Sequence, residues 1–182
     1  MQGILAADGN VLIWIQQNLR KDVLTPVMQV ITKMGDHGMF WVVLTLILLL
    51  IPKTRKAGLC SLFALVSVYV INNLIIKNLV ARTRPYEVVE GLTLIGKKAD
   101  DFSFPSGHTA SSFASMTALV RSGVIPKPYG ICLMILAVLI AFSRLYVGIH
   151  YPTDVIFGIV SGIACGFLGV FLYREFFERK QS

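Results

Sequence analysis

Charged residues are scarce in this sequence: lysine, arginine, aspartate and glutamate together make up 15% of its 182 residues. A soluble domain needs about a quarter of its residues charged to cover its surface. Hydrophobic residues reach 55%. These proportions exclude a soluble globular domain, a disordered chain and a basic nucleic-acid-binding domain.

Cysteine is also sparse, and its spacing indicates no special chemistry. The three cysteines show neither a CxxC motif nor a Cys/His pattern, and each lies within an apolar run. The sequence therefore predicts no disulfide framework and no zinc site. Its start lacks the basic segment and the apolar length of a cleavable signal peptide, so we expect none.

The sequence does contain long uncharged stretches of 15 to 20 residues. Five contain no Asp, Glu, Lys or Arg: Gly38–Pro52, Ala57–Ile76, Phe102–Val120, Pro128–Ser143 and Val155–Tyr173. A helix needs about 20 residues to cross the hydrocarbon layer, so the shorter stretches must borrow flanking residues. We predict an all-α integral membrane helical bundle over residues 38–182, with five transmembrane helices.

The first 37 residues form a different kind of segment. Val11–Leu19 and Val23–Thr32 are apolar but short, and the charged triplet at 20–22 separates them. We predict two short helices lying at the membrane interface over residues 1–37. A single additional span, giving six in total, is the alternative.

Polar residues that lipid would not tolerate gather in three clusters. The first is Lys77-x6-Arg84-Pro85, after the second apolar stretch. Seven residues make two helical turns, so both cations can lie on one helix face, and Pro85 is expected to end the helix and make Arg84 extended. Taken alone, a basic helix end most often anchors a helix at the membrane surface.

The second cluster, residues 103–109, opens the third apolar stretch. Pro105 suits the first turn of a helix, Ser106 can cap it, and Gly107 allows a ligand to approach the backbone closely. Free N–H groups and the positive end of the helix dipole would then face one point. The pattern predicts an anion site with His108 beside it, or otherwise a capped helix with an incidental histidine.

The third cluster is Ser143-Arg144-x5-His150-x3-Asp154, between the fourth and fifth stretches. Pro152 fits the first turn of the last helix, so Asp154 lies one turn beyond His150 and can accept its ring N–H. This arrangement fixes the tautomer of a nucleophilic histidine. A purely structural His–Asp pair is the alternative.

The predicted topology places the three clusters on one side of the membrane. The site would then hold three cations, Lys77, Arg84 and Arg144, against one carboxylate, Asp154. Metal sites are dominated by neutral or anionic ligands, so this balance disfavours a divalent metal and predicts no cofactor. It favours a phosphate whose transition-state charge is stabilised by fixed cations and N–H groups.

The three clusters resemble the signature motifs of the type 2 phosphatidic-acid phosphatase superfamily: Lys77-x6-Arg84-Pro85, Pro105-Ser106-Gly107-His108 and Ser143-Arg144-x5-His150-x3-Asp154. The resemblance implies that His150 attacks phosphorus to form a phosphohistidine, that Asp154 orients it, and that His108 protonates the leaving oxygen. It also implies a set of phosphate-binding groups: Lys77, Arg84, Ser106, the Gly107 amide and Arg144.

We therefore expect a multi-pass cell-membrane enzyme that removes a terminal phosphate from a lipid without a metal. Undecaprenyl pyrophosphate and phosphatidylglycerophosphate are equally favoured, with phosphatidic acid also considered, because the motifs recognise phosphate and not the tail. A transporter that binds phosphate or another anion is the alternative. A haloperoxidase would use the same residue types around vanadate, but five membrane spans suit a lipid substrate better. The bilayer is the expected environment, and no nucleic-acid partner is expected.

Basic residues predict the orientation. Eight lie in the loops and tail opposite the motifs: Lys53, Arg55, Lys56, Arg121, Lys127, Arg174, Arg179 and Lys180. The motif side holds six, of which three are assigned to phosphate, and the N-terminal segment adds three if it does not span. Because the positive-inside bias is strongest near span ends, we predict a site on the extracytoplasmic face.

Smaller features complete the expectations. Gly158, Gly162 and Gly166 recur every four residues and predict close packing of the last helix against a neighbour. Asn72 and Asn73 lie inside the second span and are expected to hydrogen-bond between helices. Five charges near the motifs are interpreted as solvated loop residues: Arg82, Lys97, Lys98, Asp100 and Asp101.

Overall fold

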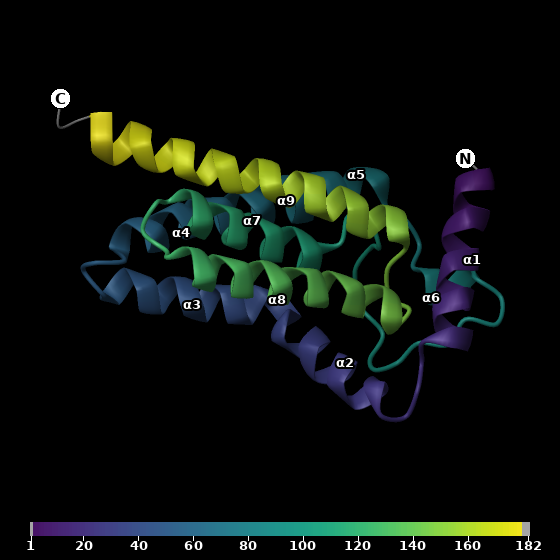
Figure 1. Ribbon diagram of the computed structural model, residues 1–182. Helices are drawn as coiled ribbons and strands as arrows, with labels where there is room; N and C mark the ends of the chain where they lie inside the picture. The colour runs from purple at the N-terminus through teal and green to yellow at the C-terminus, as the bar shows by residue number, and fades with distance from the viewer. Residues whose placement is uncertain (1, 180–182) are drawn as a thin grey trace.

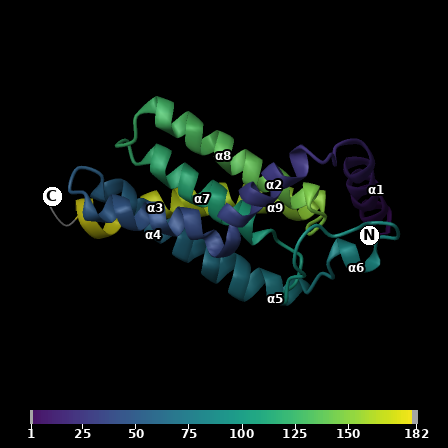
Figure 2. The same cartoon turned by 90° about the horizontal axis from the view of Figure 1, so that it is seen from below.

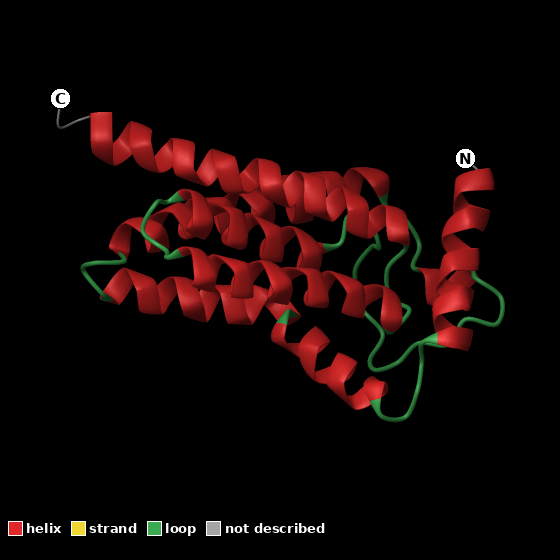
Figure 3. Cartoon of the chain, viewed as in Figure 1, coloured by secondary structure: helices red, strands yellow, loops and turns green. Residues whose placement is uncertain are grey.

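The computed structural model describes residues 2–179, and all of the secondary structure in that range is helical (Figure 3). The α-helices are α1 (Gln2–Asn18), α2 (Leu24–Met34), α3 (Met39–Leu50), α4 (Arg55–Val68), α5 (Lys77–Val80), α6 (Pro85–Val88), α7 (Gly107–Arg121), α8 (Lys127–Tyr146) and α9 (Pro152–Tyr173). A 3₁₀ turn, Asp36–Gly38, joins α2 to α3, and π-helical segments at Tyr69–Ile76 and Arg174–Glu178 extend α4 and α9. Lys180, which the charge count includes, lies outside the described residues.

The long helices lie side by side, with α7 inside the bundle (Figures 1 and 2). Its most extensive contacts are with α9, α4 and α8, and most of its residues are buried. Ala110, Ala114 and Ala118 are fully buried on this helix. Small side chains let neighbouring backbones approach closely, so the composition of α7 suits a central helix enclosed by protein.

Three segments within the described range are long and apolar enough to cross a membrane: Arg55–Val88, Lys127–Tyr146 and Pro152–Glu178. The pair α2 and α3, bent by 50°, gives a fourth if it forms one span. Helix α7 has 15 residues, fewer than the roughly 20 that a straight crossing needs. The predicted all-helical membrane bundle is confirmed, whereas the count of five spans stays a prediction.

The glycine stripe on α9 packs as predicted. A Cβ atom on Gly162 would lie 2.6 Å from the carbonyl oxygen of Ala110, and one on Gly166 would lie 2.5 Å from Cβ of Thr117. Both neighbours belong to α7. Glycine is therefore required here because no side chain fits between the two helices.

Hydrogen bonds between helices occur inside the bundle. Asn72 Nδ2 donates to Ser161 Oγ at 2.8 Å, and Trp41 Nε1 donates to Ser112 Oγ at 2.8 Å. The prediction for Asn72 is confirmed, whereas the buried Oδ1 of Asn73 has no hydrogen-bond partner among the described residues. Such bonds satisfy polar groups that would otherwise face an apolar interior.

The two ends of the bundle differ. The α3–α4 turn, the α7–α8 turn and the end of α9 lie at one end, and α1 and α6 lie at the other (Figure 1). Two separate N-terminal helices form as predicted, and α1 stands across the end of the bundle (Figure 1). The starts of α7 and α9 also lie at this end, so the three sequence clusters come together there.

Candidate active site

Two predicted phosphate-binding cations meet at one carboxylate. Lys77 Nζ lies 2.5 Å from Oδ2 of Asp101, and Arg84 Nη2 forms an ion pair with Oδ1 of the same side chain. Arg84 Nη1 lies 3.4 Å from Nε2 of His150. The first and third sequence clusters therefore adjoin each other. Asp101, interpreted above as a solvated loop charge, is 53% exposed, and it also pairs with both cations.

The local backbone explains how Lys77 and Arg84 converge. Helix α5 ends at Val80 because Ala81 adopts a left-handed conformation with φ of 47°. Arg84 is extended as predicted. Pro85, however, begins α6 and does not end the preceding helix, since proline fits the first helical position. The cations converge through a turn and not along one helix face.

The start of α7 is capped by Ser106, as predicted. The Ser106 hydroxyl lies 2.9 Å from Oγ1 of Thr109, and the Ser106 N–H donates to the carbonyl oxygen of Asp154 at 3.2 Å. Pro105 precedes the cap, so its predicted place in the first turn was wrong. Either hydroxyl can donate in that contact, so the Ser106 O–H is available to phosphate when Thr109 is the donor. Gly107 begins the helix itself.

Helix α9 begins at Pro152, as predicted, and this brings His150 to Asp154. The Nδ1 atom of His150 lies 3.4 Å from Oδ2 of Asp154, beyond the usual hydrogen-bond length, and has no hydrogen-bond partner among the described residues. Catalytic hydrogen bonds are often long without substrate and tighten when it binds. The ring is oriented with Nδ1 toward the carboxylate and Nε2 toward Arg84.

The surroundings of His150 favour the neutral imidazole. Its side chain is 2% exposed, and burial, together with the positive charges of Arg84 and Arg144, lowers the pKa of His150 to about 3, against the opposing effect of Asp154. A neutral imidazole has a free lone pair on one ring nitrogen. With Nδ1 facing Asp154, that lone pair belongs to Nε2, on the side of the cations.

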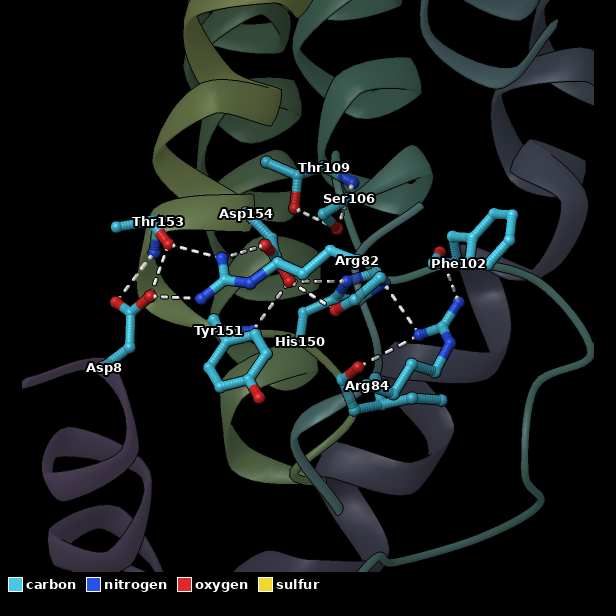
Figure 4. A network of polar contacts seen from close by, with 12 residues as sticks. Asp8, Arg82, Arg84, Phe102, Ser106, Thr109, His150, Tyr151, Thr153 and Asp154 are labelled. Atoms are coloured by element: carbon cyan, nitrogen blue, oxygen red, sulfur yellow. Dashed lines mark hydrogen bonds and ion pairs between the residues drawn. The ribbon is translucent and has the colours of Figure 1, made fainter. Parts of the chain in front are cut away.

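Asp154 is held from several directions (Figure 4). Its Oδ2 accepts from Ser103 Oγ at 2.5 Å and from the Tyr151 N–H at 2.9 Å. Its Oδ1 accepts from Arg82 Nη1 at 2.6 Å. Arg82 is only 16% exposed, so its interpretation as a solvated loop charge was wrong, whereas Lys97, Lys98 and Asp100 are exposed as expected.

Arg144, the third predicted cation, is buried, and it forms no ion pair with a carboxylate among residues 2–179. Its Nη1 donates to Thr32 Oγ1 at 2.5 Å. An isolated buried charge is unfavourable unless it is paired. Arg144 is therefore suited to pair with an anion that enters the site.

His108 adjoins the N-terminal part of the chain. Its Nε2 lies 3.0 Å from Oδ1 of Asp36. A Cβ atom on Gly35 would lie 2.5 Å from Cδ2 of the His108 ring, so a glycine is needed where the α2–α3 connection meets this ring. The structure thus places a carboxylate next to the histidine that the resemblance assigns as proton donor.

Several residues around the site were missed by sequence reasoning. Asp8, Thr32 and Asp36 come from the N-terminal helices, and no local pattern links them to motifs 40 or more positions later. Asp101 had a usable signal, because it lies seven residues before His108. Ser103 belongs to the second cluster, but no role was assigned to it. No group of three His, Cys, Asp or Glu side chains in residues 2–179 is placed to hold a metal ion.

Residues 57–178 of the chain match the family model of the PAP2 superfamily. This range includes every residue of the three clusters. This chain belongs to the PAP2 superfamily. The resemblance seen in the motifs is thereby confirmed. The match leaves out the N-terminal helices α1, α2 and α3.

Two proteins with similar sequences are named as phosphatases, in agreement with this family. The chain is 37% identical over 131 residues to an undecaprenyl-diphosphatase of Sulfolobus acidocaldarius, covering 71% of this chain and 62% of that protein. It is 30% identical over 150 residues to a decaprenylphosphoryl-5-phosphoribose phosphatase of Mycolicibacterium smegmatis, covering 81% and 79%. The chain thus spans less than two thirds of the Sulfolobus protein.

A solved structure has the same fold. The transmembrane PAP2-type phosphatidylglycerolphosphate phosphatase of Bacillus subtilis superposes with a TM-score of 0.78 at 24% identity. The superposition covers 97% of this chain and 89% of that one. The shared fold therefore extends over nearly the whole chain.

Proposed function

We propose that this protein is a membrane lipid phosphate phosphatase that works through a phosphohistidine at His150. The observation that carries the proposal is the position of a buried His150 between Asp154 and a set of buried cations at one end of a membrane bundle. Nε2 faces Arg84, the group that would hold a phosphate oxygen, and Nδ1 faces Asp154. This is the geometry of a nucleophile and its orienting carboxylate.

The proposed reaction has two steps. In the first, the Nε2 lone pair attacks phosphorus, the bond from phosphorus to the leaving oxygen breaks, and His108 gives its proton to that oxygen. In the second, water attacks phosphorus and gives a proton to His108, the bond from phosphorus to Nε2 breaks with its electron pair returning to His150, and inorganic phosphate leaves. Lys77, Arg84 and Arg144 stabilise the charge on the equatorial oxygens in both steps.

A lipid is the proposed substrate class because of where the site lies. The outer faces of α8 and α9 expose large apolar side chains, as a lipid-facing surface does. An apolar hollow of about 340 Å³ lies along α2 and α3, lined by residues that include Lys33, Phe40 and Ile47. Its lining residues Met34 and Met39 flank in sequence the turn that carries Asp36, which contacts His108, and we propose this hollow as the place of the lipid tail. Relatives named for lipid phosphates add support.

We also propose that the site opens on the extracytoplasmic face. The basic residues at 53–56 and 121–127 lie at the end of the bundle opposite α1 and α6 (Figure 1). Basic residues near span ends favour the cytoplasmic side. Residues 1–37 would then form the interfacial segment on the outer surface.

Phosphate release from defined lipids tests the proposal. Purified protein in detergent should release inorganic phosphate from at least one of undecaprenyl pyrophosphate, phosphatidylglycerophosphate and phosphatidic acid, with EDTA present, because cations of the protein take the electrostatic role of a metal. The His150→Ala variant should lose essentially all turnover, and the exposed-loop control Lys97→Ala should keep it. Folded protein that binds phosphate but releases none from any lipid would contradict the proposal and favour the transporter.

A further inference from the structure

Arg82 connects two buried carboxylates that come from distant parts of the chain. Its Nη1 donates to Asp154 Oδ1 at 2.6 Å and to Thr153 Oγ1 at 2.7 Å. Its Nη2 donates to Asp8 Oδ2 at 2.8 Å. The side chains of Asp8 and Asp154 are 5% and 0% exposed. Figure 4 shows the guanidinium lying between them.

The guanidinium is itself held in place. It lies over the Tyr151 ring, with Cζ 3.7 Å from the ring centroid, a distance suited to a cation–π contact. Asp8, on α1, also accepts hydrogen bonds from the backbone N–H and the hydroxyl of Thr153. Helix α1 is thus fastened to the first turn of α9 through Asp8, and Arg82 is enclosed by that contact.

Arg82 controls both oxygens of Asp154. Its side chain holds Oδ1 directly, and its carbonyl oxygen accepts the Ser103 N–H at 2.8 Å. Ser103 in turn donates its hydroxyl to Oδ2, the oxygen nearest His150. Rotation of the carboxylate would break the Arg82 contact at one oxygen and the Ser103 contact at the other.

We propose that Arg82 is a positioning residue for the His150–Asp154 pair, anchored by Asp8, and that α1 thereby supports the active site. The inference rests on the proposed function. Arg82 contacts Asp154 and not the reacting phosphate, and it acts by fixing which oxygen faces Nδ1. Loss of outer partners that orient a reacting group costs about 10–100-fold in enzymes where this has been measured at metal sites.

The kinetic signature separates this role from phosphate binding. Arg82→Ala should lower kcat by about 10–100-fold and change KM by less than about twofold, because substrate binding does not use the residue. Asp8→Asn should lower kcat in the same way but by less, since the contact to Asp154 remains. Arg82→Lys, which keeps the charge but loses the planar fork, should recover part of the activity.

A double-mutant cycle decides the mechanism. Phosphate release is measured for Arg82→Ala in the native chain and in an Asp154→Ala background. Lys97→Ala is the control, and thermal unfolding in detergent checks that each variant is folded. If Arg82 acts through Asp154, its replacement should cost less than about twofold once Asp154 is absent. If Arg82→Ala does not fold, Arg82→Lys takes its place in both backgrounds.

Three outcomes would count against the inference. An equal fold-loss in both backgrounds, or a loss confined to KM, would contradict the positioning role in an otherwise active phosphatase. Full activity of Arg82→Ala would do the same. A wild-type protein that releases no phosphate would instead contradict the proposed function itself, so the two failures are distinguishable.

Discussion

Among single residues, Asp101 has the most direct relation to the proposed phosphate site. Its carboxylate pairs with Lys77 and Arg84, the two cations that would hold phosphate oxygens. Partial burial alone would raise the pKa of Asp101, but the hydrogen bonds and charges of Lys77 and Arg84 lower it below its usual value. Asp101 therefore stays ionised near neutral pH and competes with an incoming phosphate for the same donors.

Replacing Asp101 should strengthen anion binding. Asp101→Asn keeps the shape of the side chain and removes the competing charge, so we expect the vanadate inhibition constant to fall by about 3–10-fold, a modest effect because the carboxylate is half exposed. The matched control is Asp100→Asn, an exposed neighbour. Weaker inhibition in Asp101→Asn alone would show that the carboxylate holds the cations in place for phosphate.

Sequence spacing identified residues that are close to each other along the chain. The helix start at Pro152 is a local feature, so the approach of His150 to Asp154 could be predicted. Asp8 and Asp36 could not, because their contacts depend on how the N-terminal helices pack against the bundle. Arg82 was misinterpreted for the same reason: its carboxylate partners lie more than 70 positions away.

At the scale of helices, the contact between α7 and α9 sets the geometry of the site. His108 lies in the first turn of α7 and Asp154 lies in the first turn of α9, and the two helices run in close contact. The spacing between them is fixed by glycines on α9 that leave no room for a Cβ atom. A wider spacing between α7 and α9 would move His108 and Asp154 apart.

Gly162 offers a test of that contact. Gly162→Val would place its Cβ 2.6 Å from the Ala110 carbonyl oxygen and 3.0 Å from Phe113 Cβ, and backbone cannot yield as a flexible side chain can. We expect a loss of about 1–3 kcal/mol of stability, seen as a lower Tm in detergent. Val160→Leu, at an exposed position of the same helix, should leave Tm unchanged. Equal Tm values for both variants would mean that the helices are not tightly packed.

Apolar runs predicted where the long helices lie better than where they begin and end. The run from Phe102 contains α7, but the helix starts only at Gly107, because the serines and Pro105 before it form a capped, non-helical entry. The number of membrane spans was harder to predict than the ends of the helices. Helix α7 carries no Asp, Glu, Lys or Arg before Arg121 because it is buried inside protein, and composition does not separate that from burial in lipid.

At the scale of the whole molecule, the distribution of charge between the two bundle ends is the basis for the proposed orientation. Lys97 lies in the exposed loop between α6 and α7, and Lys127 begins α8 at the opposite end. Single cysteines at these positions in a Cys-free variant would report the orientation on intact cells. A membrane-impermeant thiol reagent should label Lys97→Cys and spare Lys127→Cys.

The reverse labelling pattern would overturn the proposed orientation. It would leave the chemistry of the site unaffected, because the contacts among His150, Asp154 and Arg84 do not depend on which face of the membrane they occupy. Labelling of both positions on sealed cells would contradict the assignment of the two loops to opposite faces.

The covalent intermediate is the central claim, and trapping it is the most direct test. Protein incubated briefly with a ³²P-labelled lipid phosphate and quenched in base should carry label that acid removes, as expected for a phosphohistidine. The label should be absent from His150→Ala and present in the Lys97→Ala control. Label that persists in folded His150→Ala, or rapid turnover with no trapped label in the wild-type protein, would contradict the account.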